Sequence, residues 1–217
     1  MDRLLTRGLV ALAAIAVSGA SQAVVIYNNF GSGTDYGWFD GDSQGWGVFG
    51  SGVMGSGQRV YESFDTGSFS GMLTSISVGV SLMEGPSDVV VSLLADKSGV
   101  PDDLSVLGTW DLTDIVAWGA DPTPPPETIT AGPIALAAGT KYWVLVAPGQ
   151  DKTYADWGWS DPLVSGTFYL GSGNGVYIGR GNLSAMEVEG DPTGVPAPAA
   201  VVPFALGLLA FRRRARR

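Results

Sequence analysis

Alternation of apolar with small polar residues, interrupted by frequent glycines and prolines, is the feature that most constrains the fold of this chain. The segment 76–82, ISVGVSL, carries an aliphatic side chain at every second position. Successive side chains of an extended strand point to opposite faces of a sheet, so this pattern predicts a half-buried strand. The chain has 32 glycines and 13 prolines, and no long stretch repeats with the period of a helix. We therefore expect an all-β fold.

Other short apolar segments predict further strands separated by turns. Residues 89–94 (VVVSLL) form a continuous apolar run typical of an inner strand, and residues 142–146 (YWVLV) form another strong one. Weaker strands are expected at 167–170, 175–178 and 183–188. Short strands at this spacing, with Gly, Pro and Asp turns between them, favour an antiparallel β-sandwich of jelly-roll-like type, with a barrel as the alternative.

Several segments between the strands have turn or loop composition. Residues 31–57 contain 10 glycines in 27 residues and are expected to form a long structured loop or a glycine-spaced hairpin. Residues 121–126 (DPTPPP) predict a polyproline-type connector, and residues 99–101 (GVP) predict a turn between strands. In the strand that follows a tight turn at LAAGT, Tyr142 and Trp143 are expected to point to opposite faces of the sheet.

The N-terminus has the three parts of an export signal. Two basic residues, Arg3 and Arg7, precede an apolar run at 8–17, and the tripeptide Ser-Gln-Ala ending at Ala23 has the small-x-small pattern of a signal peptidase site. Cleavage is expected after Ala23, which makes residues 1–23 a signal peptide.

The last 23 residues combine a proline motif, an apolar segment and a cluster of arginines. The apolar segment 199–211 would form a helix about 20 Å long, whereas a bilayer core is about 30 Å thick. We therefore expect a short apolar helix that spans a membrane only marginally, with the arginines held on the cytoplasmic side. The alternative is an amphipathic or core helix that ends in solvated charge. The motif residues are Val195, Pro196, Ala197, Pro198 and Ala199, and the arginines are Arg212, Arg213, Arg214, Arg216 and Arg217.

This tail resembles the PEP-CTERM group of bacterial sorting signals, in the variant called VPLPA-CTERM, with Ala197 in place of the leucine of that motif. The resemblance implies that an exosortase-type transpeptidase recognises the proline motif and cuts the tail while it transiently spans the inner membrane. Residues 189–198 would then be the linker and sorting motif, and residues 199–217 the apolar helix and Arg-rich tail. The chain contains no cysteine, which excludes anchoring through a lipidated cysteine and excludes disulfides.

Two segments in the middle of the chain resemble choice-of-anchor domains, most closely the type R group. They are residues 89–107 (VVVSLLADKSGVPDDLSVL) and residues 136–160 (LAAGTKYWVLVAPGQDKTYADWGWS). The resemblance implies that residues 24–188 form a β-sandwich ectodomain of an exported or surface protein. It supplies no catalytic residues that can be assigned to this chain.

Charge and composition exclude several classes of function. Residues 24–194 contain five basic residues against 20 acidic ones, a net charge of −15, compared with −9 for the whole chain. A surface this acidic repels phosphate, so we expect no nucleic acid partner. With no histidine and no cysteine, Ser-His-Asp and Cys-His catalysis and His-ligated zinc are impossible. Paired carboxylates, such as Asp156 with Asp161, leave a glycoside hydrolase open, although the sequence selects no particular pair.

Aromatic residues offer the best candidates for ligand binding. Exposed indole rings stack on sugars, and an envelope protein meets polysaccharide, but the same rings also suit a sandwich core. The candidate tryptophans are Trp38, Trp46, Trp157 and Trp159.

A group of acids in the segment DYGWFDGDS suggests a calcium site as an alternative to the absence of any cofactor. Calcium takes six to eight hard oxygen ligands, but the spacing does not match an EF-hand, and Asx turns between glycines explain the same residues. The candidate ligands are Asp35, Asp40 and Asp42.

These features predict an exported, non-enzymatic protein of the bacterial cell envelope or extracellular matrix, with a structural or adhesive role. Its expected partners are signal peptidase, an exosortase-type sorting enzyme and, transiently, the inner membrane. The alternative is a carbohydrate-binding module for exopolysaccharide, assisted by calcium. A third interpretation, a carboxylate-based glycoside hydrolase, rests only on the abundance of acids.

Overall fold

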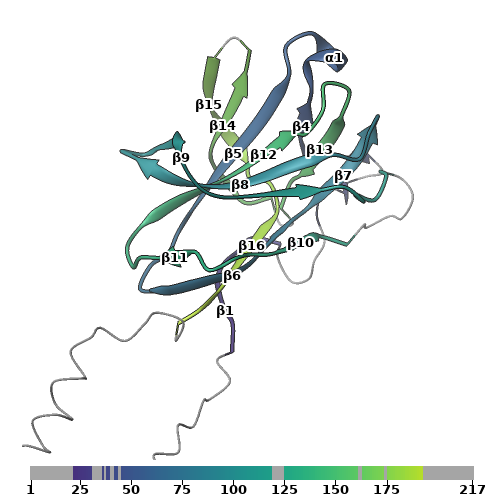
Figure 1. Ribbon diagram of the computed structural model, residues 1–217. Coiled ribbons are helices and arrows are strands. Elements are labelled where there is room, and N and C mark those ends of the chain that lie inside the picture. The colour runs from purple at the N-terminus through teal and green to yellow at the C-terminus, as the bar shows by residue number, and fades with distance from the viewer. Residues whose placement is uncertain are drawn as a thin grey trace, which may run out of the picture.

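The computed structural model describes residues 22–30, 36, 38–39, 42–43, 45–118, 125–160, 163–173 and 175–192, and the fold there is all-β and antiparallel, as predicted (Figure 1). A four-residue helix, α1 (Ser51–Met54), accompanies the strands in this part of the chain. The strands are β1 (Val24–Asn28), β2 (Trp38–Phe39), β3 (Asp42–Ser43), β4 (Gly45–Phe49), β5 (Gln58–Asp65), β6 (Gly71–Val78), β7 (Val80–Glu84), β8 (Val89–Lys97), β9 (Val100–Leu112), β10 (Glu127–Thr130), β11 (Ala135–Leu136), β12 (Lys141–Pro148), β13 (Tyr154–Gly158), β14 (Ser165–Ser172), β15 (Gly175–Asn182) and β16 (Met186–Asp191).

Two sheets and one small hairpin contain these strands. Among the described residues, five strands form one sheet in the order β1-β16-β6-β10, with β11 also paired to β6. Nine strands form the other sheet in the order β7-β13-β4-β5-β12-β8-β9, in which β14 pairs with β5 and β15 pairs with β14. The short strands β2 and β3 pair with each other, so part of the glycine-rich segment 31–57 is a hairpin, as one of the two expectations stated.

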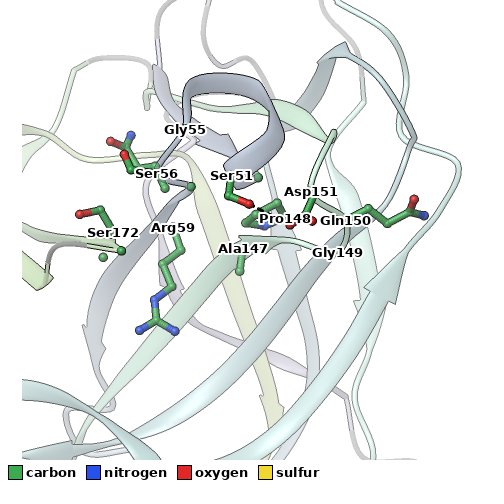
Figure 2. Close-up of a pocket in the computed structure, with 15 residues that line it drawn as sticks. Ser51, Gly55, Ser56, Arg59, Ala147, Pro148, Gly149, Gln150, Asp151 and Ser172 are labelled. Carbon is green, nitrogen blue, oxygen red and sulfur yellow. Dashed lines mark hydrogen bonds between the residues drawn. The ribbon is translucent and has the colours of Figure 1, made fainter.

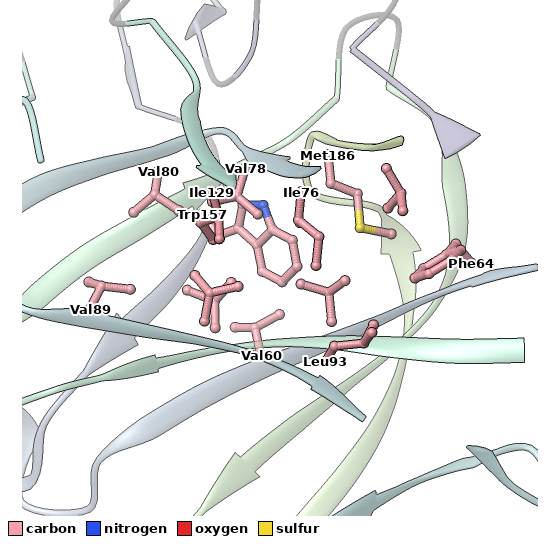
Figure 3. Packing of buried hydrophobic residues seen from close by; sticks show 14 of the residues in the cluster. Val60, Phe64, Ile76, Val78, Val80, Val89, Leu93, Ile129, Trp157 and Met186 are labelled. Carbon is pink, nitrogen blue, oxygen red and sulfur yellow. The ribbon is translucent and has the colours of Figure 1, made fainter. Parts of the chain in front are cut away.

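The main core lies between the two sides of this arrangement (Figure 3). Strands β5, β8 and β12 contribute side chains from one side, and β6, β7, β13 and β16 contribute them from the other. Because β7 and β13 belong to the nine-stranded sheet, that sheet curls around the core to meet the smaller one. The described residues contain no disulfide, so burial of apolar surface, worth about 25 cal/mol per Å², is the main source of stability.

The predicted strand at 76–82 is two strands that meet at Gly79. Strand β6 lies in the five-stranded sheet and β7 in the nine-stranded sheet, yet Ile76, Val78 and Val80 are all buried in the same core. A Cβ atom at Gly79 would lie 2.5 Å from the ring of Tyr36. The alternation therefore predicted which side chains are buried, but the corner between the sheets depends on a glycine that leaves room for an aromatic ring.

The segment 183–186 connects the two sheets through backbone hydrogen bonds. The carbonyl oxygen of Ala185 accepts the N–H of Gly79 at 2.9 Å and the indole N–H of Trp157 at 3.0 Å. The N–H of Ala185 donates to the carbonyl of Gly158 at 2.8 Å. Ala185 thus joins the corner of β6–β7, the end of β13 and the buried side chain of Trp157.

The side chain of Asn29 satisfies two further backbone groups of the same segment. Its Nδ2 donates to the carbonyl of Ser184 at 2.8 Å, and its Oδ1 accepts the N–H of Met186 at 2.7 Å. Asn29 is itself buried. The side chain therefore replaces the hydrogen bonds that a neighbouring strand would make, since buried backbone groups must be paired.

Most of the other predicted strands coincide with observed ones. Residues 89–94, 142–146, 167–170 and 175–178 lie within β8, β12, β14 and β15. The prediction for 183–188 is wrong in its first half, because residues 183–185 are the connection described above and β16 begins at Met186. Strand β16 continues to Asp191 and pairs with β6 and β1. The first three residues of the predicted linker at 189–198 therefore belong to a sheet.

The strand starting at Lys141 has the expected geometry. Tyr142 packs in the main core, whereas Trp143 packs in a second cluster on the other face of the sheet. The turn expected at 99–101 is instead formed by Ser98 and Gly99, which both have positive φ (57° and 89°), and β9 begins at the next residue. Two central residues with positive φ match the right-handed twist of a tight hairpin.

Both predicted transport segments lie almost entirely outside the described residues. Residues 1–21, which contain the apolar run of the export signal, are not among them. Residues 193–217, with the proline motif and the arginine cluster, and residues 121–124 of the proline-rich connector are not described either. Within the part of the chain that the structure describes, no helix is long and apolar enough to cross a membrane.

We predict that Asn29→Ala destabilises the fold by about 2–5 kcal/mol. The substitution leaves the Ser184 carbonyl and the Met186 N–H buried without their partner, and each such group costs about 1–3 kcal/mol. Urea denaturation measures the change in the free energy of unfolding. The control is Thr128→Ala, which removes an exposed hydroxyl hydrogen bond to Ser77 and should change stability by no more than about 0.5 kcal/mol. Equal losses in the two variants would contradict the role assigned to Asn29.

Candidate functional site

An open depression of about 540 Å³ lies on the nine-stranded sheet, on the face opposite the main core (Figure 2). Three segments that are far apart in the sequence form its walls: the loop containing α1, the turn between β12 and β13, and the end of the β14–β15 hairpin. The lining residues are Gly50, Ser51, Gly55, Ser56, Gly57, Gln58, Arg59, Ala147, Pro148, Gly149, Gln150, Asp151, Gly171, Ser172 and Gly173.

Arg59 supplies the positive charge of the depression, and Figure 2 shows it between Ser172 and Ala147. Its Nη2 donates to Asp103 Oδ2 at 3.1 Å, and its guanidinium carbon lies 5.3 Å from the centroid of the Tyr61 ring. The guanidinium group is therefore held by one carboxylate and by an aromatic face, with further N–H donors left for a ligand.

Gly171 on β14 makes this position of Arg59 possible. It pairs with Arg59 across the two strands. A Cβ atom at Gly171 would lie 2.6 Å from Arg59 Nε and 3.1 Å from Tyr61 Cε2. A side chain at 171 would therefore push the guanidinium group off the sheet, so the glycine shapes the floor of the site.

The walls of the depression are held by hydrogen bonds to the turn at Asp151. Ser51 Oγ donates to Asp151 Oδ1 at 3.0 Å, and the N–H of Gly52 donates to the carbonyl of Asp151 at 2.8 Å. A Cβ atom at Gly50 would lie 2.3 Å from that same carbonyl oxygen. Close backbone approach at a glycine therefore ties the α1 loop to the β12–β13 turn.

The floor continues into a buried cluster beneath the β8–β9 hairpin. The cluster consists of Tyr61, Leu94, Trp143, Leu145 and Tyr169. Its polar atoms bind the hairpin: the Trp143 indole N–H donates to Asp96 Oδ1 at 2.8 Å, and the Tyr169 hydroxyl donates to the Gly99 carbonyl at 3.2 Å. The Tyr61 hydroxyl donates to Asp103 Oδ2 at 3.2 Å, and burial raises the pKa of Tyr61, which keeps it a neutral donor. The β8–β9 hairpin thus covers one end of the outer face of the sheet. The depression lies at the other end and is open to solvent.

This arrangement suits the binding of a hydroxyl-rich or carboxylate-bearing ligand. Amide, hydroxyl and backbone groups line the depression around a single guanidinium group. The two nearby carboxylates already have partners, because Asp103 binds Arg59 and Asp151 binds Ser51. Such a set of groups offers directional hydrogen bonds and one charge, which is the usual composition of a small-ligand site.

The structure places Trp157 in the core. Its side chain is 0% exposed and its indole N–H is bonded to Ala185, so this residue is not available to a sugar. Its burial follows from its position on β13, whose inner face closes the curled sheet.

Trp46 and Trp159 are only partly buried, and they pack against each other with ring centroids 5.7 Å apart. Trp46 also lies 4.1 Å from the ring of Phe168 and donates its indole N–H to the Asn182 carbonyl at 2.8 Å. These contacts cover part of the Trp46 ring, and neither indole is fully buried. Trp38 belongs to β2, whose side chains lie outside the described residues.

The predicted calcium ligands are not tested. Asp35 and Asp40 lie outside the described residues, and Asp42 belongs to β3, whose side chains are likewise not described. Among the described residues, no group of three or more acids is placed to hold a metal ion. Of the carboxylate pair considered for glycoside hydrolysis, Asp156 is buried on β13 and Asp161 is outside the described part.

Sequence reasoning missed the depression because its walls come from three distant turns. One signal was available: Arg59 is one of only five basic residues between 24 and 194. A rare cation in a strongly acidic domain is an informative residue, but only the folded chain brings Gly171 and Asp151 to it.

The sequence matches no model of a known protein family and no curated protein.

A second polar position lies inside the fold, at Glu62 on β5. Its side chain is fully buried, and Oε1 accepts the N–H of Ser184 at 2.5 Å. The other oxygen, Oε2, has no hydrogen-bond partner among the described residues. Burial raises the pKa of Glu62 to about 8, and the hydrogen bonds from Ser184 oppose this shift only in part. The carboxyl group is therefore protonated at neutral pH, which avoids an unpaired charge in the core.

We predict that the stability of the protein falls as the pH rises from about 4.5 to about 8. The pKa of Glu62 is about 8 in the folded state and 4.5 in a solvated chain, so the folded state binds more protons in this interval. The free energy of unfolding must then decrease with pH and level off above the folded-state pKa.

The variant Glu62→Gln isolates this effect, because it keeps the shape of the neutral acid and cannot ionise. Thermal melts between pH 5 and pH 9 should show similar stability of variant and wild type at pH 5. At pH 9 the variant should be the more stable by more than about 1.4 kcal/mol, the equivalent of one pKa unit. Glu84→Gln, at the exposed end of β7, is the control. If the stability of Glu62→Gln depended on pH in the same way as that of the wild type, a group other than Glu62 would cause the dependence.

Proposed function

We propose that this chain is an exported, non-enzymatic protein of the bacterial cell envelope or extracellular matrix, with a structural or adhesive role. We further propose that its described part is a jelly-roll-like β-sandwich. The curled nine-stranded sheet, the five-stranded sheet and the core between them support this classification.

The observation that carries the proposal is the position of the candidate site relative to the ends of the domain. Strands β1 and β16 are neighbours, with Val24 paired to Gly190. In Figure 1 both lie toward one end of the domain, whereas α1 and the β14–β15 hairpin, which line the depression, lie at the opposite end. A domain tethered by its C-terminal tail would therefore present the depression away from the membrane.

Processing at the tail belongs to this proposal. The export signal at 1–23 would direct the chain across the inner membrane, and the tail would hold it there until an exosortase-type enzyme acts at the proline motif 195–199. The short apolar segment and the basic terminus suit a transient anchor better than a permanent one.

We predict that replacing Pro196 and Pro198 together with alanine blocks processing. An uncut precursor should accumulate in the membrane fraction of the producing cells, detected by its higher mass on immunoblots against an epitope placed directly after Ala23. Pro192 and Ala200 lie outside the motif. The control variant, Pro192→Ala with Ala200→Ser, should therefore be processed normally. Normal cleavage of the double proline variant would refute motif-dependent sorting.

The depression favours a second candidate function, binding of exopolysaccharide. Its amide, hydroxyl and backbone groups suit sugar hydroxyls, and Arg59 suits a sugar carboxylate. This position is separate from the tryptophans suggested by the sequence, of which Trp157 is buried. A calcium site at Asp35, Asp40 and Asp42 stays part of this alternative as a prediction.

We predict that Arg59→Ala weakens binding to a carboxylate-bearing polysaccharide by about tenfold or more, since a hydrogen bond to a charged group is worth about 1.5–3 kcal/mol. Affinity electrophoresis in gels containing polygalacturonate, with dextran as the neutral polymer, measures the change. Lys152→Ala removes an exposed cation outside the lining of the depression and controls for net charge. Equal retardation of wild type and Arg59→Ala, or equal losses in the two variants, would reject the site.

A further inference from the structure

The β14–β15 hairpin presents an apolar sheet edge. Among the described residues, β15 pairs with β14 alone, so the other side of β15 has backbone groups without a neighbouring strand. Three consecutive apolar side chains on β15 are exposed: Val176 by 49%, Tyr177 by 55% and Ile178 by 66%. Exposed edge strands of this kind are templates for pairing with another strand.

Both faces of β15 are available to such a strand. Ile178 is paired with Tyr169 and therefore lies on the outer face of the sheet, whereas Tyr177 is paired with Leu170 and lies on the other face. A strand added to this edge would cover apolar side chains on each side as well as the free backbone groups. The contact would thus combine hydrogen bonding with burial of apolar surface.

The other ends of the nine-stranded sheet have features that oppose pairing. Strand β9 has register irregularities opposite Leu94, and Asp102 there caps a local turn by accepting the N–H of Leu104 at 3.2 Å. The edge of β7 is occupied, because the Leu82 N–H donates to the Val116 carbonyl at 3.0 Å. Bulges, acids and covering segments are the usual protection of edge strands. Strand β15 pairs with β14 in an unbroken register over eight residues and carries neither proline nor an acid.

The distribution of charge indicates what the edge can accept. The stretch 162–186 contains no acidic residue, and Arg180 is its only charged one, within a domain of net charge −15. Two copies of the domain repel each other over most of their surfaces, but much less where these acid-free hairpins meet. The hairpin is therefore a part of the described surface where a second copy meets little repulsion.

We propose that two copies of this chain associate through β15, paired antiparallel around a two-fold axis near Ile178. Closed two-fold dimers are the commonest soluble oligomers, and each copy contributes the same surface. The two Arg180 side chains then lie on opposite sides of the axis, so they do not oppose each other. The nine-stranded sheet continues from one copy into the next, and each copy keeps its own depression.

Single cysteines test this contact directly, because the chain has no cysteine of its own. Near the axis of an antiparallel pair, equivalent Cβ atoms lie about 4.5–5.5 Å apart, which is close to disulfide distance. Mild oxidation of the full-length Ile178→Cys protein should give a covalent dimer on non-reducing gels. Leu104→Cys, on a side chain that is 91% exposed in β9, should give no more than random collision does.

Sedimentation equilibrium of the full chain in detergent provides the second measurement. The wild type should be a dimer in the micromolar range, Ile178→Lys a monomer, and the matched control Leu104→Lys a dimer. Val176→Lys is a second variant of the same strand and should also be a monomer. A thermal melt of each variant distinguishes loss of the contact from loss of folding. A monomeric wild type overturns the proposal, and so does a dimer that both β15 variants leave intact, since the contact would then lie elsewhere.

Discussion

The carbonyl oxygen of Ala185 is the point on which the two sheets depend. It accepts hydrogen bonds from the corner of β6–β7 at Gly79 and from the indole of Trp157, while the N–H of the same residue binds the end of β13. With no disulfide in the described residues, only the backbone connections and non-covalent contacts hold the curled sheet against the smaller one. A buried carbonyl that serves two donors therefore ties the corner between the sheets to the core, and Asn29 supports it by pairing the flanking backbone groups.

One face of β5 contributes to the stability of the core, and the other contributes to the candidate binding site. Its inward residues are Val60, Glu62 and Phe64, and the acid in this series is kept neutral by burial. Of its outward residues, Arg59 lines the depression and Tyr61 lies in the neighbouring buried cluster, and both bind the β8–β9 hairpin through Asp103. The alternation of a single strand thus connects a pH-sensitive core to a charged outer surface, because successive side chains point to opposite sides.

Charge is distributed in a way that fits the proposed display of the domain. The acids that give residues 24–194 their net charge of −15 are absent from 162–186, and five of the twelve basic residues of the chain lie in its last six positions. A negatively charged domain stays soluble and resists unspecific contact with itself. Contacts are then favoured at the few places without acids, and the β14–β15 hairpin is such a place.

The sequence by itself determined the all-β fold class, the positions of the strands with the clearest apolar patterns and the burial of the alternating side chains at 76–80. Alternation at 76–82 and the apolar runs at 89–94 and 142–146 predict strands, because the side chains of a strand follow a pattern that depends only on neighbouring residues. It also determined that no histidine or cysteine chemistry exists here.

Only the tertiary structure decided which sheet each strand joins, since Gly79 changes the sheet without interrupting the alternation. It also decided that Trp157 is core rather than binding surface, and that Arg59 meets Gly171 and the turn at Asp151 in one depression. The depression depends on contacts between residues about 90 to 110 positions apart, since Arg59 meets Asp151 and Gly171 there, and a local pattern carries no information about such contacts.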